Sequence, residues 1–260
     1  MPAVLVTGVS RLQGIAAAVA RHLAEDGWTV AATGYRPYDE TESWGADPDA
    51  PDRLLSEGVL ASWSENDLAD AEAPARVVGV AEDVVGPLTA LVIVHTESRA
   101  GGILDTTAAV FDRHLAINAR ATLLLIAEFA RRFRREPGSG RIVAFTSDAV
   151  HGEVAYGASK AALERIAVAA AAELGAQGIT VNVVNPGPTD TGWISAELNE
   201  RIRRATPLGR VGRPEDAAQL VAFLCSPRGS WITGQILVCD GGASVAPTLR
   251  GGRQIGRAHV

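Results

Sequence analysis

The sequence predicts an α/β fold built on a doubly wound parallel sheet of about seven strands, with helices on both faces. Short apolar runs of β character alternate with alanine-rich helical patterns along the chain, and this alternation is typical of consecutive βαβ units. A glycine-containing turn directly follows the first apolar run and precedes the first helical pattern, as in nucleotide-binding sheets of this type. No internal repeat or interdomain linker is evident, so we expect a single domain over residues 1–242.

Each predicted strand is a short, mainly apolar run. The runs are Ala3–Thr7, Thr29–Thr33, Val59–Trp63, Ala90–Val94, Arg141–Thr146, Ile179–Val184 and Gln235–Val238. Longer segments between them carry helical patterns of apolar residues. The predicted helices are Ile15–Glu25, Ala71–Val85, Ala108–Arg135, Ala158–Leu174 and Pro214–Leu224. Parallel strands joined by such helices form a sheet that is covered on both faces.

Three segments depart from this alternation. Residues 37–51 are rich in Asp, Glu and Pro, and they predict a long loop beside the second strand. Residues 187–210 contain Pro and Gly after the sixth strand, and we expect a mobile substrate lid there. The tail, residues 243–260, has little apolar periodicity, which is compatible with disorder, and it enters no functional argument.

Composition excludes several classes of protein. A formal charge of −6, from 30 acidic and 24 basic residues, provides no overall positive field for nucleic acid. Cys225 and Cys239 have neither the spacing of a zinc site nor the number needed for a disulfide framework. The chain begins with a strand-like run and has no apolar stretch of membrane-spanning length. We therefore expect a cytoplasmic protein with no metal and no membrane or nucleic-acid partner.

The first turn of the predicted sheet is a candidate nucleotide site. It reads Thr-Gly-Val-Ser-Arg-Leu-Gln-Gly-Ile over residues 7–15. Glycines between a strand and a helix let backbone amides approach a pyrophosphate at the positive end of the helix. A glycine turn before any helix would look similar, so this indication depends on its context. The candidate cofactor contacts are Gly8, Ser10, Arg11, Gly14 and Ile15.

We expect the residues at the end of the second strand to determine whether NAD(H) or NADP(H) binds. An acidic residue there would accept hydrogen bonds from the ribose 2′-hydroxyl, but residues 34–36 are Gly, Tyr and Arg. Arg36 and Arg11 can form charge-assisted bonds with a 2′-phosphate. The alternative is that both arginines are simply solvated. We expect NADP(H) to be favoured over NAD(H).

Tyr156 and Lys160 are the candidate catalytic pair. They are one helical turn apart, so their side chains share a helix face. A phenol with an ordinary pKa of about 10 needs a nearby cation to act near neutral pH, and Lys160 can supply that charge. Such pairs are common on surfaces by chance. Ser147, about nine residues before Tyr156, adds a hydroxyl at the end of the fifth strand, where open α/β sheets bind ligands.

Several ordered segments resemble those of the short-chain dehydrogenase/reductase family, which has a Rossmann-type fold. They are the glycine turn, Asp67-Leu68, His114 to Arg120, the Tyr-x-x-x-Lys helix, Asn185 to Thr191, Gly209 to Asp216 and Ile232 to Gly242. The resemblance covers about residues 3–242 and is to compact, 3-oxoacyl-reductase-like members. It implies a homotetramer that moves a hydride between NADP(H) and a carbonyl or secondary alcohol, with Tyr156 as general acid/base.

The same resemblance implies roles for individual residues. Ser147 would hydrogen-bond the substrate carbonyl, Asn118 would support a water in the proton relay, and Lys160 would also hold the nicotinamide ribose. Further cofactor contacts would be Asp67 and Leu68 beside the adenine, and Pro186, Gly187, Thr189 and Thr191 beside the nicotinamide.

Two departures from the family pattern stand out. Leu12 and Gln13 are extra residues in the glycine turn, and Ile-Val-His-Thr at 93–96 replaces an Asn-Asn-Ala-Gly run. His95 would narrow the site or act as a structural filler. This replacement supports one alternative, a catalytically silent NADP(H)-binding regulatory protein of the same fold. A second alternative, a Rossmann-like methyltransferase, would not need the Ser147, Tyr156 and Lys160 series. The substrate is left open.

Overall fold

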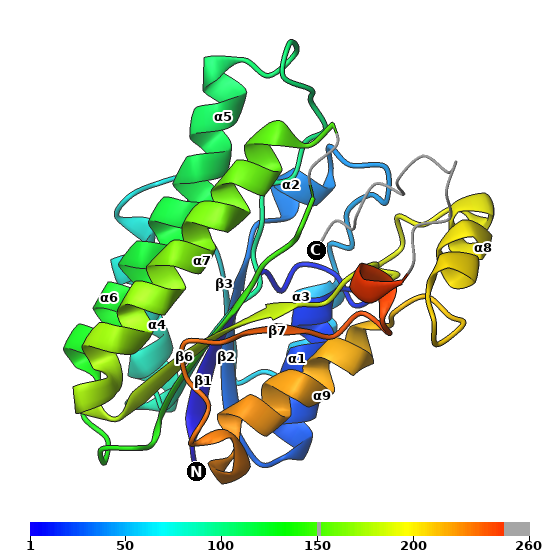
Figure 1. Ribbon diagram of the computed structural model, residues 1–260. Coiled ribbons are helices and arrows are strands. Elements are labelled where there is room, and N and C mark those ends of the chain that lie inside the picture. The colour runs from blue at the N-terminus through cyan, green and yellow to red at the C-terminus, as the bar shows by residue number, and fades with distance from the viewer. Residues whose placement is uncertain (150–151, 247–260) are drawn as a thin grey trace.

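Seven parallel strands form one continuous sheet within the part of the chain that this computed structural model describes, residues 1–149 and 152–246 (Figure 1). Their order is β3-β2-β1-β4-β5-β6-β7. The strands are β1 (Ala3–Thr7), β2 (Thr29–Gly34), β3 (Ser62–Glu65), β4 (Ala90–Ile93), β5 (Gly140–Phe145), β6 (Ile179–Asn185) and β7 (Ile236–Val238). The strand order reverses between β1 and β4, and ligands bind at such switch points beyond the carboxyl ends of the strands. The predicted fold class is confirmed.

Helices cover both faces of the sheet (Figure 1). One layer contains α1 (Ile15–Glu25), α3 (Ala50–Ser56) and α9 (Pro214–Cys225). The opposite layer contains α4 (Ala73–Val85), α6 (Ala121–Arg132) and α7 (Val154–Leu174). The remaining helices are α2 (Arg36–Asp39), α5 (Ala108–His114) and α8 (Ala196–Ala205).

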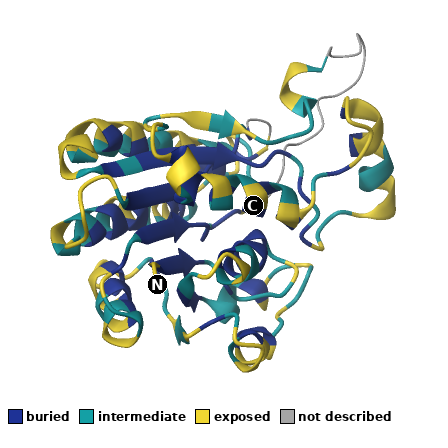
Figure 2. Cartoon of the chain, turned by 90° about the horizontal axis from the view of Figure 1, so that it is seen from below, coloured by how far each residue is buried: buried dark blue, intermediate teal, exposed yellow. Residues whose placement is uncertain are grey.

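The strands are the most continuously buried part of the molecule (Figure 2). Side chains alternate between two apolar cores because successive strand residues point to opposite faces. On β1, Val4 and Val6 pack with the α1 and α9 layer, whereas Ala3 and Leu5 pack with the α4, α6 and α7 layer. The two edge strands differ among the described strands, since β3 has no fully buried residue and the two end residues of β7 are exposed. No helix in the described ranges has the length and apolarity needed to cross a bilayer.

Two predicted elements near the second strand are corrected. The predicted strand 59–63 lies too early, because β3 begins at Ser62 while Val59 and Leu60 pack into the core beside α3. Buried residues that lead into a strand give the same apolar pattern as the strand itself. Residues 37–51, predicted as a loop, contain most of α2 and the start of α3.

The long helix predicted over residues 108–135 is interrupted. A π-helical segment, Leu115–Arg120, separates α5 from α6, and α6 ends at Arg132. The segment predicted as a lid contains α8, in which only Ile202 is buried. In the tail, residues 247–260 lie outside the described residues.

Candidate active site

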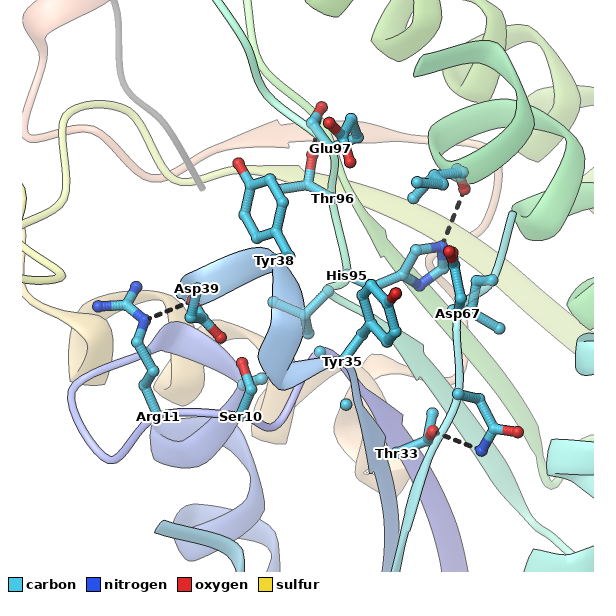
Figure 3. Close-up of a pocket in the computed structure, with 18 of the residues that line it drawn as sticks. Ser10, Arg11, Thr33, Tyr35, Tyr38, Asp39, Asp67, His95, Thr96 and Glu97 are labelled. Carbon is cyan, nitrogen blue, oxygen red and sulfur yellow. Dashed lines mark hydrogen bonds and ion pairs between the residues drawn. The ribbon is translucent and has the colours of Figure 1, made fainter. Parts of the chain in front are cut away.

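A pocket opens at the switch point between β1 and β4 (Figure 3). The structure brings most of the predicted cofactor contacts into its lining. They are Gly8, Ser10, Arg11, Gly14, Ile15, Asp67, Leu68 and Thr191. Five predicted cofactor contacts are not part of this lining: Arg36, Lys160, Pro186, Gly187 and Thr189.

The glycine turn has the geometry of an anion-binding cradle. Gly8 has a φ of +84°, and a Cβ there would lie 2.8 Å from the backbone N of His95. Glycine is therefore needed where β1 and β4 end side by side. No side chain caps the N-terminus of α1 at Gly14, so the first-turn amides can face an anionic group. These features fit the pyrophosphate of a dinucleotide.

The two extra residues of this turn extend it toward the acidic segment after β2. The backbone N of Leu12 donates to Oδ2 of Asp47 at 3.2 Å. Gln13 reaches the segment 187–210, since its side-chain oxygen would lie 3.2 Å from a Cβ placed on Gly192. The two extra residues therefore connect the glycine turn with the segments around Asp47 and Gly192.

The two candidate arginines lie in different surroundings. Arg11 lines the pocket, where its Nε is 3.0 Å from Oδ1 of buried Asp39 (Figure 3). Its Nη1 donates to the carbonyl of Thr191 at 2.8 Å. Its guanidinium also lies 4.9 Å from the ring centroid of Trp44. Arg36 pairs instead with Glu65 at 2.6 Å. Asp39 could not be predicted from the sequence, because residues 37–51 contain several carboxylates and no local pattern distinguishes this one.

A chain of charged side chains lies along the pocket wall at Asp67. Arg113 on α5 bridges Oδ2 of Asp67 at 3.3 Å and Oε2 of Glu97 at 3.1 Å. Glu97 is buried and also pairs with Arg99. Sequence analysis missed Glu97 and Arg113, although a carboxylate directly after the replaced run 93–96 was a signal that was available.

Tyr156 and Lys160 lie in the first two turns of α7, and both side chains are fully buried. The Nζ of Lys160 lies 5.7 Å from the centroid of the Tyr156 ring and donates to the carbonyl of Phe145 at 3.0 Å. Burial lowers the pKa of Lys160 to about 7, because the charged form loses its hydration. The predicted pair is therefore a buried assembly and not a chance surface pair.

Ser147 follows β5 by two residues and is buried beside the start of α7. Its Oγ accepts a hydrogen bond from the backbone N of Ala149 at 3.2 Å. A Cβ on Gly157 would lie 2.4 Å from the carbonyl oxygen of Ala149, so this glycine lets the loop lie directly on the helix. The short connection between Ser147 and Tyr156 depends on that contact, and residues 150–151 lie outside the described part.

Asn118 lies in the π-helical segment, fully buried. Its Oδ1 accepts from the backbone N of Glu97 at 2.7 Å, and its Nδ2 donates to the Glu97 carbonyl and to Oγ of Ser159, each at 2.8 Å. Ser159 in turn donates to the carbonyl of Tyr156 at 2.8 Å. Ser159 was missed as a site residue, although it lies inside the Tyr-x-x-x-Lys motif. The network connects the pocket wall at Glu97 with α7.

The segment after β6 folds over the same edge of the sheet. Gly187 has a φ of +62°, and Oγ1 of Thr189 bonds the carbonyls of Pro186 and Gly187, each at 3.3 Å. Backbone bonds join Pro188 and Asp190 to Gly212. This turn leads the chain to Thr191 at the pocket.

Comparisons with known proteins agree with this geometry. A family model described as enoyl-(acyl carrier protein) reductase matches residues 8–244. The uncharacterized oxidoreductase YjdA of Bacillus subtilis (strain 168) is 36% identical over 247 residues, which cover 92% of this chain and 95% of the relative. The NADPH-dependent aldehyde reductase-like protein, chloroplastic, of Arabidopsis thaliana is 34% identical over 257 residues, covering 92% of each chain.

A solved structure extends the likeness to three dimensions. The short chain dehydrogenase from Burkholderia cenocepacia J2315 in complex with NADP is 34% identical and superposes with a TM-score of 0.81, covering 94% of this chain and 98% of that chain. The chain therefore belongs to the short-chain dehydrogenase/reductase family. It is an NAD(P)-dependent oxidoreductase of CH–OH and C=O groups.

Proposed function

We propose that this protein transfers a hydride between NADP(H) and a carbonyl or secondary alcohol, with Tyr156 as the general acid/base. The observation that carries the proposal is the buried grouping of Tyr156, Lys160 and Asn118, which hydrogen bonds connect to Glu97 in the pocket lining. The Arabidopsis relative, an NADPH-dependent aldehyde reductase-like protein, supports the same chemistry.

The residues of this chain have separate tasks in the reductive direction. NADPH supplies the hydride when it is bound. Ser147 donates a hydrogen bond from Oγ to the substrate carbonyl oxygen, which stabilises the charge that develops there. Tyr156 donates the proton from Oη to that same oxygen. Lys160 favours the Tyr156 anion that remains, and Asn118 holds the water through which a proton returns.

The preference for NADP(H) rests on Arg11. Its guanidinium lies at the pocket wall, and residues 34–36 contribute no carboxylate, so a 2′-phosphate meets a cation beside the end of β2. The NADP complex of the Burkholderia neighbour supports this choice. Asp39 holds Arg11 in position through its Nε.

A homo-oligomer is part of the proposal, with a tetramer expected from the family resemblance. Two surfaces of the described chain leave apolar side chains in solvent. Leu123 on α6 and Val168 on α7 form one, while Ile236 and Val238 on β7 form the other. Exposed apolar groups of this kind are typical of contacts between subunits.

Replacing Tyr156 by Phe tests the assignment most directly. The change removes one hydroxyl from a fully buried ring, so the fold and NADPH affinity should survive while turnover falls at least about a hundredfold, the scale of general acid catalysis. Tyr38→Phe is the comparison variant: Tyr38 lines the pocket and its hydroxyl bonds the backbone of Ser98, so the change should act on cofactor affinity and leave the chemical step in place.

The assay is NADPH oxidation over a panel of aldehydes and ketones, with cofactor affinity measured by fluorescence. Undiminished turnover in Tyr156→Phe would remove Tyr156 from the mechanism. A wild type that binds NADPH and reduces no member of the panel would favour the silent regulatory protein.

A further inference from the structure

We propose that His95 is a positioning residue that holds Asn118 in place for the proton relay. This inference rests on the proposed function and assigns a task to the histidine that stands in the unusual run after β4. His95 lines the cofactor pocket, and its ring is buried.

Both ring nitrogens of His95 make hydrogen bonds, one of which is drawn in Figure 3. Nε2 lies 3.0 Å from the carbonyl oxygen of Ile117, and Nδ1 lies 2.7 Å from Oγ1 of Thr7. A carbonyl can only accept, so Nε2 carries the proton and Nδ1 accepts the Thr7 hydroxyl. Burial lowers the pKa of His95 to about 4, which agrees with this neutral tautomer at physiological pH.

The bond to Ile117 acts directly beside Asn118. Residues 115–120 form the π-helical segment, a geometry that is less stable than an α-helix and needs outside contacts. His95 holds this turn through Ile117, and Glu97 holds it through two bonds to the Asn118 amide. Residues 95–97 therefore hold residues 117–118 at two neighbouring points. One is the hydrogen bond from the His95 imidazole to Ile117, and the other is the pair of bonds between the Glu97 backbone and the Asn118 amide.

An apolar side chain at position 95 could fill the same space but could not make the two hydrogen bonds of the imidazole. It would leave the Ile117 carbonyl and the Thr7 hydroxyl without their His95 partner in a buried site, and losing a buried partner is costly. The backbone cannot shift to compensate, because Gly8 packs against the backbone of His95 with no room even for a Cβ. Loss of the ring should therefore loosen the turn that carries Asn118.

The test compares three variants of the full chain. His95→Phe keeps a ring of similar size and loses both hydrogen bonds, whereas His95→Gln keeps an amide that can donate to Ile117. His114→Phe is the matched control, since His114 is also fully buried with two ring bonds, to Val110 and Arg99, but lies outside the pocket lining.

We expect His95→Phe to lower turnover about tenfold or more while the Kd for NADPH stays within about threefold, because small displacements of catalytic groups act mainly on the reacting complex. His95→Gln should recover most of the turnover. Hydrogen–deuterium exchange of residues 115–120 should speed up in His95→Phe without cofactor, which gives a readout independent of activity.

Turnover in His95→Phe close to that of wild type, or exchange unchanged in residues 115–120, would overturn the inference. So would an equal loss of turnover in His114→Phe at matched thermal stability. The two proposals fail in different ways. A wild type that binds NADPH but reduces no substrate overturns the proposed function. An active wild type whose His95→Phe variant is equally active overturns only the role of His95.

Discussion

Replacing Lys160 by Met should make the folded protein more stable while it abolishes activity. Lys160 is fully buried, and its ammonium donates a hydrogen bond to the Phe145 carbonyl at 3.0 Å. Burial lowers the pKa of Lys160 from 10.5 to about 7. This fall corresponds to about 5 kcal/mol of unfavourable free energy for the protonated form in the folded state. Losing the bond to Phe145 offsets about 1.5–3 kcal/mol, so we expect a net gain of about 2 kcal/mol at pH 6.5.

The pH dependence gives the prediction its signature. Below about pH 7 the lysine is protonated in both the folded and the unfolded chain, and the destabilisation is constant. Between about pH 7 and 10.5 the unfolded chain binds more protons, so the free energy of unfolding of the wild type should rise with pH. Lys160→Met lacks this contribution, and the advantage of the variant should shrink across that window.

Urea unfolding of the cofactor-free protein, followed by tryptophan fluorescence at fixed protein concentration, measures both effects. Conducting the series at pH 6.5, 8 and 9.5 covers the window in which the two proteins should converge. The reasoning would be refuted if the free energies of unfolding of the wild type and Lys160→Met changed with pH in parallel, or if the variant were less stable at pH 6.5. Either result would show that the buried charge of Lys160 does not destabilise the folded state.

Two further predictions concern the cofactor and the assembly. Arg11→Ala should weaken NADPH binding about tenfold to a hundredfold relative to NADH, the range for a charge-assisted bond. Arg36→Ala should have the smaller effect, because Arg11 lines the pocket and Arg36 does not. Fluorescence titration with both cofactors compares the two variants, and a larger loss in Arg36→Ala would reverse the assignment. Light scattering at micromolar concentration should give the mass of a homo-oligomer, with tetramer expected, and Val238→Asp on exposed β7 should lower that mass. A wild type that is only monomeric would contradict this proposal.

The parts of the molecule that the sequence predicts best are governed by local geometry. Helical spacing is enough to place Tyr156 and Lys160 on one face, and a strand followed by a glycine turn is enough to place Gly8 at the switch point. The α1 boundaries agree with the prediction for the same reason, since a short turn and a clear apolar pattern delimit the helix. The alternation of strands and helices then identifies the sheet.

Contacts between distant segments were beyond such reasoning. Arg11 reaches the Thr191 carbonyl across 180 residues of sequence, and its pairing with Asp39 depends on how α2 folds back. Arg36 illustrates the converse, because its position after β2 suggested a phosphate contact while Glu65 on the neighbouring strand engages it. The role of His95 likewise becomes visible only when Thr7 and Ile117 are both in place.

The π-helical turn also sets the rotational phase of the helix that follows it. Each residue of an α-helix turns the chain by about 100°, and a π turn accommodates one residue more than an α turn. With this extra residue, Asn118 faces α7 while Leu125, Ile126 and Phe129 of α6 face the core. Deleting a single residue from 115–120 would restore a regular helix only by rotating one of these faces away from its partner. The active-site amide and the packing of α6 therefore constrain each other, and changes in chain length should be tolerated less well in this turn than single substitutions on its outer side.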